Sequence, residues 1–130
     1  MAKAAKPAKP EDAINWFEIP VRDLDRAARF YETILGIKLS RMDMPGGGYA
    51  MWPFSADVLG GALVKAKGRV PSKRGTIVYL ACGPDMNVAL KEVKGAGGTV
   101  LEKKFAIGEN GFIAFFEDTE GNRVALHSMS

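Results

Sequence analysis

The stretch VRDLDRAARFYETILG, residues 21–36, predicts a helix with a defined start and a defined end. Asp23 is placed to cap the first turn, because a short carboxylate can accept a hydrogen bond from a backbone N–H there. Gly36 is of the residue type that most often ends a helix. Apolar residues between them recur at helical spacing and predict one buried face, made of Leu24, Ala27, Ala28, Tyr31 and Leu35.

Strand candidates surround this helix. Residues 14–21 (INWFEIPV) precede it and are rich in aromatic and β-branched side chains, which favour strands. Three further candidates follow it, with the turn PGGG between the first two; they are residues 37–44, 49–54 and 61–65. The predicted order of the first half is therefore β-α-β-β-β.

The same order returns after a segment rich in Lys and Arg. Residues 76–82 predict a strand, and residues 86–96 predict a helix that Asp85 can cap. The remaining strand candidates, the last two joined across the turn TEGN, are residues 98–105, 112–118 and 123–128. The second half thus repeats the element order of the first.

The two halves also match in local pattern. FEIPVRDLDRA and VYLACGPDMNV, which start 61 residues apart, each predict a strand, a short loop and a helix opened by Asp. A repeat of this period indicates a duplication. We therefore expect an α+β fold with a flexible Lys/Ala/Pro-rich arm and one domain built from two modules and a linker. The expected bounds are 1–12 for the arm, 13–130 for the domain, about 14–65 and 76–128 for the modules, and 66–75 for the linker.

The composition is that of one globular domain of 130 residues, 47% of them hydrophobic. No uncharged apolar run approaches the roughly 20 residues that a membrane-spanning helix needs. The start, MAKAAKPAKP, has basic residues but no apolar segment behind them, so we expect no signal peptide. Cys82 is the only cysteine and allows no internal disulfide, which favours a cytoplasmic location.

The net charge of +3 does not predict a nucleic-acid partner. Lys3, Lys6 and Lys9 in the arm account for the whole excess of positive charge. A second basic cluster, KAKGRVPSKRG at residues 65–75, has no aromatic side chains among its cations. Single-stranded nucleic acids are usually bound by cations together with aromatic groups that stack on the bases. We therefore expect neither a nucleic acid nor a membrane as partner.

Two motifs resemble the vicinal oxygen chelate superfamily, the group of glyoxalase I, bleomycin-resistance proteins and extradiol dioxygenases. VRDLDRAARFYETILG is similar to its pattern V-x-D-L-x-x-x-x-x-F-Y-x-x-x-L-G, and FFEDTEGNRVALHS, residues 115–128, is similar to its closing D-P-x-G-N-x-x-x-L. The resemblance covers about residues 14–128. It implies tandem βαβββ modules whose curled sheets surround a cup, and it implies a homodimer. It leaves the activity open, because one fold hosts many functions.

Metal-binding members of this superfamily place one ligand on the first strand and one on the last strand of each module. The resemblance puts these positions at residues that do not ligate cations: Trp16, Ile77, Ala125 and residues 61–63. In addition, His127 is the only histidine in the chain, whereas zinc, nickel and non-heme iron sites of this kind rely on imidazole and carboxylate ligands. We therefore expect no metal and no other cofactor.

Strand alternation predicts which side chains face the cup. If Trp16 points inward, so does Glu18, and if Ala125 points inward, so does His127. The same rule brings in Tyr79 from the second module. The predicted ligand contacts are Trp16, Trp52, Tyr79 and Phe112, and the predicted catalytic residues are Glu18 and His127.

The polar candidates each have a structural alternative. Glu18 is either a carboxylate bridged to an arginine such as Arg22 or Arg123, or a ligand anchor or base whose pKa is raised by apolar neighbours. His127 is either a strand-end residue in partial solvent or a group that helps in hydrogen bonding and proton transfer. Trp52 either packs in the core or stacks on a planar ligand.

Three functions follow from these candidates. The first is metal-independent binding of a small organic molecule in the cup, as in glyoxalase- and bleomycin-resistance-like proteins. The second is an enzyme of the glyoxalase group, a lyase, isomerase or epimerase acting on a carbonyl compound with Glu18 or His127 as base. The third is an interaction module that works through the basic arm.

Overall fold

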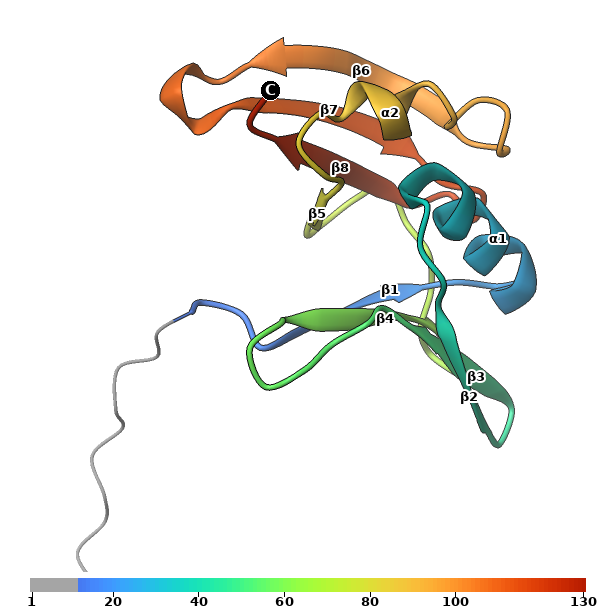
Figure 1. The fold of residues 1–130 in the computed structure, drawn as a ribbon. Coiled ribbons are helices and arrows are strands. Elements are labelled where there is room, and N and C mark those ends of the chain that lie inside the picture. Colours follow the sequence, from blue (N-terminus) through green and yellow to red (C-terminus); the bar gives the residue numbers. More distant parts are fainter. Residues whose placement is uncertain (1–11) are drawn as a thin grey trace, which may run out of the picture.

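Two four-stranded mixed sheets form the protein, which is seen here in a computed structural model that describes residues 12–130 (Figure 1). The first sheet has the strand order β1-β4-β3-β2 and the second the order β5-β8-β7-β6. Each sheet belongs to one βαβββ module, so the predicted α+β fold of tandem modules is confirmed. All of the predicted arm except Asp12 lies outside the described residues.

In the first module the elements are β1 (Trp16–Pro20), α1 (Leu24–Leu35), β2 (Ser40–Met44), β3 (Gly47–Met51) and β4 (Gly60–Lys65). In the second they are β5 (Tyr79–Ala81), α2 (Asn87–Leu90), β6 (Thr99–Ala106), the short 3-10 helix η1 (Gly108–Asn110), β7 (Phe112–Glu117) and β8 (Arg123–Ser128). The first strand of each module pairs in parallel with the last, β1 with β4 and β5 with β8. Strands β1 and β5 therefore each form an edge of their sheet.

Helix α1 has the bounds that the sequence predicts. The side chain of Asp23 accepts a hydrogen bond from the backbone N–H of Arg26 at 3.0 Å. Gly36 ends the helix in the left-handed conformation, with φ of 64°, and its N–H donates to the carbonyl of Glu32. The buried side of α1 includes Ala27 and Tyr31, as expected, and α1 lies to one side of the two sheets in Figure 1.

Helix α2 is shorter than the predicted 86–96. Regular helix covers only Asn87–Leu90, and the chain then continues in turns whose backbone hydrogen bonds span three, four or five residues without a regular pattern. The turns contain Gly95 and Gly97, and glycine opposes regular helix because it loses much conformational freedom on folding. The residue at the N-cap is Met86, whose side chain makes no capping bond, rather than the predicted Asp85. Asp85 nevertheless accepts a hydrogen bond from the N–H of Asn87 at 2.9 Å.

The core joins both modules around α1. Phe30 and Tyr31 of α1 are almost fully buried and contact each other edge to face, with ring centroids 5.0 Å apart. Both rings also lie near Phe116 of β7, at 5.7 and 6.2 Å. One helix of the first module therefore packs on a strand of the second. Neither helix in residues 12–130 is long and apolar enough to cross a membrane.

The loop between β7 and β8 binds the start of α1 through a polar network. Glu120 accepts hydrogen bonds from the backbone N–H groups of Arg22, at 2.9 Å, and Asp23, at 2.8 Å. The Arg26 guanidinium donates to the same carboxylate, with Nε 2.7 Å from Oε2. The Glu120 side chain is fully buried, while that of Arg26 is about half exposed. The second module thus satisfies N–H groups at the N-terminus of the first module's helix.

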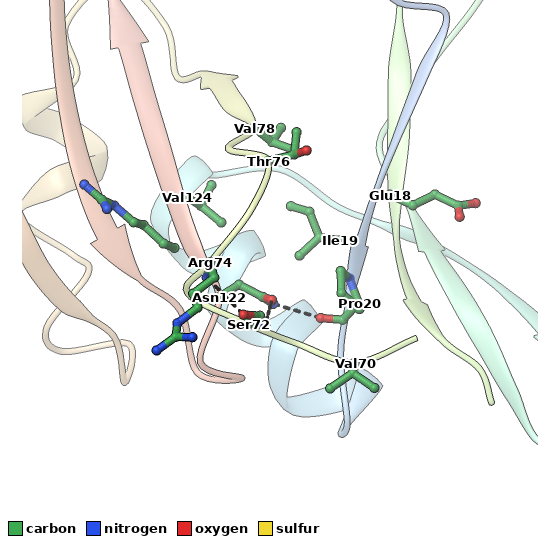
Figure 2. Close-up of a pocket in the computed structure, with 11 residues that line it drawn as sticks. Glu18, Ile19, Pro20, Val70, Ser72, Arg74, Thr76, Val78, Asn122 and Val124 are labelled. Atoms are coloured by element: carbon green, nitrogen blue, oxygen red, sulfur yellow. Dashed lines mark hydrogen bonds between the residues drawn. The ribbon is translucent and has the colours of Figure 1, made fainter. Parts of the chain in front are cut away.

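Two more residues of this loop extend the network. Asp118 accepts the hydroxyl hydrogen of Tyr31 at 2.6 Å and the backbone N–H of Asn122 at 2.9 Å. The Asn122 amide donates to the carbonyl of Pro20 at 2.8 Å, and its oxygen accepts the N–H of Ser72 in the linker at 3.0 Å (Figure 2). We call Asp118, Glu120, Asn122 and their partners the interlock. It fixes the end of β1 against the start of β8.

The interlock predicts how the stability of the fold changes at acid pH. Burial alone would raise the pKa of Glu120, but hydrogen bonds from Arg26, Asp23 and Arg22 outweigh it and lower the pKa to about 2. A carboxylate with a lowered pKa in the folded state stabilises the fold above its ordinary pKa near 4.5, and this stability is lost as the pH falls towards 2. Burial raises the pKa of Asp118, which acts with the opposite sign.

We expect Glu120→Gln to lower the free energy of unfolding at pH 7 by about 2 kcal/mol, because the Arg26 guanidinium loses its anionic partner and charge-assisted hydrogen bonds to the carboxylate are lost. We also expect the variant to lose less stability than the wild type between pH 5 and pH 2. Urea denaturation at a series of pH values measures both effects. Equal pH slopes for the two proteins would contradict the assignment of the lowered pKa to Glu120.

Candidate functional site

A cavity of about 680 Å³ lies between β1 and the segment 76–81. Its wall is largely apolar and contains four of the predicted site residues, Trp16, Glu18, Trp52 and Tyr79. The other lining residues are Ile14, Phe17, Leu59, Thr76, Ile77, Val78, Leu80 and Ala81. A volume of this size suits a small organic molecule, because ligand pockets commonly occupy several hundred cubic ångströms.

The edge strands explain how these side chains meet. Trp16 and Glu18 alternate along β1 with Phe17, so they lie on the face opposite to it. Trp16 is 37% exposed and contacts Phe54 of the β3–β4 loop edge to face, at a centroid distance of 5.3 Å. Phe17 turns towards the core and contacts Trp52 at 5.1 Å. The cavity is therefore lined by aromatic groups from both faces of β1.

Trp52 packs against the core and also lines the cavity. Its ring lies 5.6 Å from that of Tyr31, in the core, and it also lines the cavity. Tyr79 lies in β5 beside Ala125 of β8 and is 52% exposed. Its ring contacts Phe115 at a centroid distance of 6.0 Å. The cavity thus has one aromatic wall anchored in the core and another that is open to solvent.

Glu18 forms an ion pair with Arg69 of the linker. This partner is neither of the two arginines that the sequence suggested, Arg22 and Arg123, and the guanidinium of Arg123 lies over the ring of Phe115 instead. A linker residue was not expected to contact β1. The Glu18 side chain is 24% exposed, so the pair lies at the rim of the cavity and its carboxylate already has a cationic partner.

His127 and Phe112 do not line this cavity. His127 lies in β8 between Ala81 and Ile113, and its Nε2 is 2.7 Å from the carbonyl oxygen of Asn110. Because a carbonyl only accepts, Nε2 carries the hydrogen in this contact, and His127 anchors the β6–β7 loop. Phe112 packs against the core, with the Nζ of Lys104 4.6 Å from its ring centroid.

The donor set at the expected metal positions does not fit a metal. The strand register places Trp16 beside Gly60 and Tyr79 beside Ala125, while Ile77 lies before the start of β5. Within residues 12–130, no three His, Cys, Asp or Glu side chains gather in a way that could hold an ion. The side chains at these positions supply bulk and aromatic surface instead.

A second cavity, of about 200 Å³, adjoins the first, because Glu18, Thr76 and Val78 line both. Figure 2 shows Ile19 and Val124 facing each other across it, while Glu18 points to the other side of β1. The linker contributes Val70, Ser72 and Arg74, and β8 contributes Val124 and Arg123.

Sequence patterns missed these linker residues, because a segment rich in Lys, Arg and Gly resembles a solvated loop. The linker is held against the sheets by the hydrogen bond from Ser72 to Asn122 and by the ion pairs of Arg69 with Glu18 and of Lys73 with Glu117.

The fold and the cavity can be compared with known proteins. The model of the bleomycin resistance protein-like N-terminal family matches residues 14–52. Putative glyoxylase CFP32 of Mycobacterium tuberculosis is 28% identical over 116 residues, which are 86% of this chain and 44% of the relative. Glyoxalase I of Zea mays is 26% identical, with a TM-score of 0.62, over 88% of this chain and 45% of that one. In sequence and in fold the chain is therefore similar to proteins of the glyoxalase/bleomycin-resistance, or vicinal oxygen chelate, group.

Smaller members of the superfamily match over their whole length. A glyoxalase/bleomycin resistance protein from Albidiferax ferrireducens aligns over 92% of this chain and 100% of its own, with 15% identity and a TM-score of 0.69. By contrast, the chain spans about half the length of the curated relatives and of the maize enzyme. The likeness to the small members shows the vicinal oxygen chelate fold.

Phe17 depends on a glycine opposite it in β4. A Cβ at Gly61 would lie 2.3 Å from the Phe17 ring, so Gly61→Ala forces that ring to move in the cavity wall. We expect the variant to lose about 2 kcal/mol of unfolding free energy in urea denaturation, the usual cost of overpacking. Gly95→Ala is the control and should change stability by less than about 0.5 kcal/mol, because its Cβ meets nothing closer than 3.9 Å. An unchanged free energy of unfolding in Gly61→Ala would contradict this packing.

Proposed function

We propose that the protein is a metal-independent binder of a small, largely apolar organic molecule, held in the cavity between β1 and β5. The observation that carries this proposal is the apolar 680 Å³ cavity with Trp16, Phe17, Trp52 and Tyr79 in its wall. Aromatic side chains give a bound ring a large contact area at little cost in conformational entropy. We place this function in the cytoplasm, where the single Cys82 stays reduced.

The contacts of the two catalytic candidates favour binding over catalysis. A general base needs a free carboxylate or imidazole within reach of the substrate. Glu18 is paired with Arg69, and the Nε2 of His127 is bonded to a backbone carbonyl outside the cavity lining. The enzyme hypothesis, a lyase, isomerase or epimerase acting on a carbonyl compound, therefore has less support. The hypothesis of an interaction module rests on residues 1–12, almost all outside the described part of the chain.

The neutral aromatic amide 2-naphthamide is a suitable probe of the cavity. We expect it to bind the wild type, and we expect Trp16→Ala to weaken binding about tenfold, because the ring loses an aromatic wall. Glu18→Gln should change the affinity by less than about twofold, since its charge is already compensated. Isothermal titration calorimetry measures all three dissociation constants, and treatment with a chelator should leave them unchanged.

Val88→Ala, at a 62% exposed position in α2, is the matched control and should bind like the wild type. An undiminished affinity in Trp16→Ala would contradict the cavity as the binding site. Turnover of a carbonyl substrate that is lost in Glu18→Gln or His127→Ala would establish the enzyme hypothesis instead.

We also propose that the protein is a homodimer. An aromatic row crosses one face of the second sheet, where Phe115 contacts Tyr79 at 6.0 Å and Phe105 at 6.4 Å. Tyr79 and Phe105 are 52% and 41% exposed, so the row presents an apolar patch to solvent. A second copy on this face would bury the patch and close the open side of the cavity.

Sedimentation equilibrium tests the dimer. We expect a mass of twice the 14.0 kDa of one chain at about ten micromolar, and we expect Phe105→Asp to shift it to that of one chain, because a charge is placed on the buried patch. Val88→Asp, which places the same charge at a 62% exposed position in α2 outside the row, should remain dimeric. A wild type that sediments as a single chain would refute the proposal.

A further inference from the structure

Strands β1 and β5 each have one edge without a partner strand. In residues 12–130, β1 pairs only with β4, and β5 pairs only with β8. The large cavity lies between these two strands, because residues of both line it. An edge strand carries a row of backbone N–H and C=O groups that no neighbouring strand satisfies. The walls of the cavity therefore contain backbone hydrogen-bonding groups as well as aromatic side chains.

The strand register identifies the free groups on the β1 wall. In a parallel pair, the N–H and C=O of one residue bind the partner strand, and those of the next residue point away from it. The N–H of Val21 donates to the carbonyl of Val64 in β4 at 3.0 Å. Alternation therefore directs the backbone groups of Glu18 and Pro20 away from β4. Figure 2 shows the Pro20 carbonyl bonded to Asn122 on that side, which confirms the direction.

The same alternation identifies the free groups on the β5 wall. The carbonyl of Val78 accepts from the N–H of Ala125 in β8 at 3.0 Å. Tyr79 is the next residue, so its N–H and C=O are directed away from β8, on the side of the cavity. In residues 12–130, neither these groups nor those of Glu18 bind another backbone group on this side. A carbonyl from one wall and an N–H from the other are therefore available to a ligand.

An amide of the protein already connects the two walls where β1 ends. The Nδ2 of Asn122 donates to the outward carbonyl of Pro20 at 2.8 Å, and the Oδ1 of Asn122 accepts from the backbone N–H of Ser72 at 3.0 Å (Figure 2). Ser72 belongs to the linker that leads into β5. One side-chain amide thus donates to the edge of β1 and accepts from the chain that precedes β5.

We propose that the ligand of the large cavity contains a secondary amide with apolar groups on both sides. Its N–H donates to the carbonyl of Glu18, and its C=O accepts from the N–H of Tyr79, in the orientation that Asn122 has beside Pro20. A trans amide can do both, because its N–H and C=O point in opposite directions, as in the middle strand of a sheet. This inference rests on the proposed function and adds the hydrogen-bonding group of the ligand to it.

Isothermal titration calorimetry with an amide and its matching ester tests the donor of the ligand. The probes N-methyl-2-naphthamide and methyl 2-naphthoate have nearly the same shape, but only the amide has an N–H. We expect the wild type to bind the amide about tenfold more tightly than the ester, because the ester leaves the Glu18 carbonyl without a donor. The primary amide 2-naphthamide, titrated in parallel, reports whether the cavity binds aromatic compounds at all.

Proline substitution tests the N–H of Tyr79. Tyr79→Pro and Tyr79→Ala both remove the phenol ring, but only the proline variant also removes the backbone N–H. Proline is tolerated on an edge strand where the N–H points away from the ladder, and Pro20 already occupies such a position in β1. We expect Tyr79→Pro to bind N-methyl-2-naphthamide about fivefold more weakly than Tyr79→Ala, the effect of one hydrogen bond. Urea denaturation checks that both variants are folded.

An ester that binds the wild type as tightly as the amide, or two folded Tyr79 variants with equal affinity for the amide, would overturn the amide site and leave the proposed function intact. Failure of all three compounds, 2-naphthamide included, to bind at about millimolar concentration would overturn the amide site together with the proposed function.

Discussion

The buried carboxylate of Glu120 is the constraint on which the rest of the structure depends. It accepts hydrogen bonds from two backbone N–H groups and from one guanidinium, all on the other module. Without it, these N–H groups at the start of α1 would lose their acceptor within the protein. The same loop holds Pro20 through Asn122 and thereby fixes the distance between β1 and β8. The cavity exists because β1 and β5 are held in this relation.

Local patterns predicted the elements well and the tertiary contacts poorly. The bounds of α1 and β8 follow from side chains within each element, namely its cap, its apolar spacing and its turn residues. The contacts of the interlock do not follow from local patterns, because Glu120 and Arg26 are 94 positions apart and neither local pattern predicts the other residue as a partner. For α2, the local prediction of an element was itself wrong in length. The sequence predicted a helix over residues 86–96, but regular helix ends at Leu90 and turns that contain Gly95 and Gly97 follow.

For the site, strand alternation predicted on which face of a strand a side chain lies, but not which residues from other segments it contacts. It placed Trp16 and Glu18 on one side of β1, and the structure brings both to one cavity with Tyr79 and Trp52. It could not show that Arg69 reaches Glu18, because the linker has no periodic pattern from which a direction follows. Nor could it show that the His127 ring is bonded to the carbonyl of Asn110. Contacts that involve irregular segments depend on the path of the backbone in three dimensions.

The long sequence separation within the interlock also bears on how the chain folds. The bonds that Glu120 makes to the start of α1 span 94 to 98 positions, so a ribosome must add that many residues after the helix start before this acceptor is available. Contacts of such separation raise the contact order and slow folding, since a large loop must close first. The first module thus emerges from the ribosome with the N–H groups of Arg22 and Asp23 still open to other acceptors. The β7–β8 loop removes that exposure when Glu120 accepts from both groups.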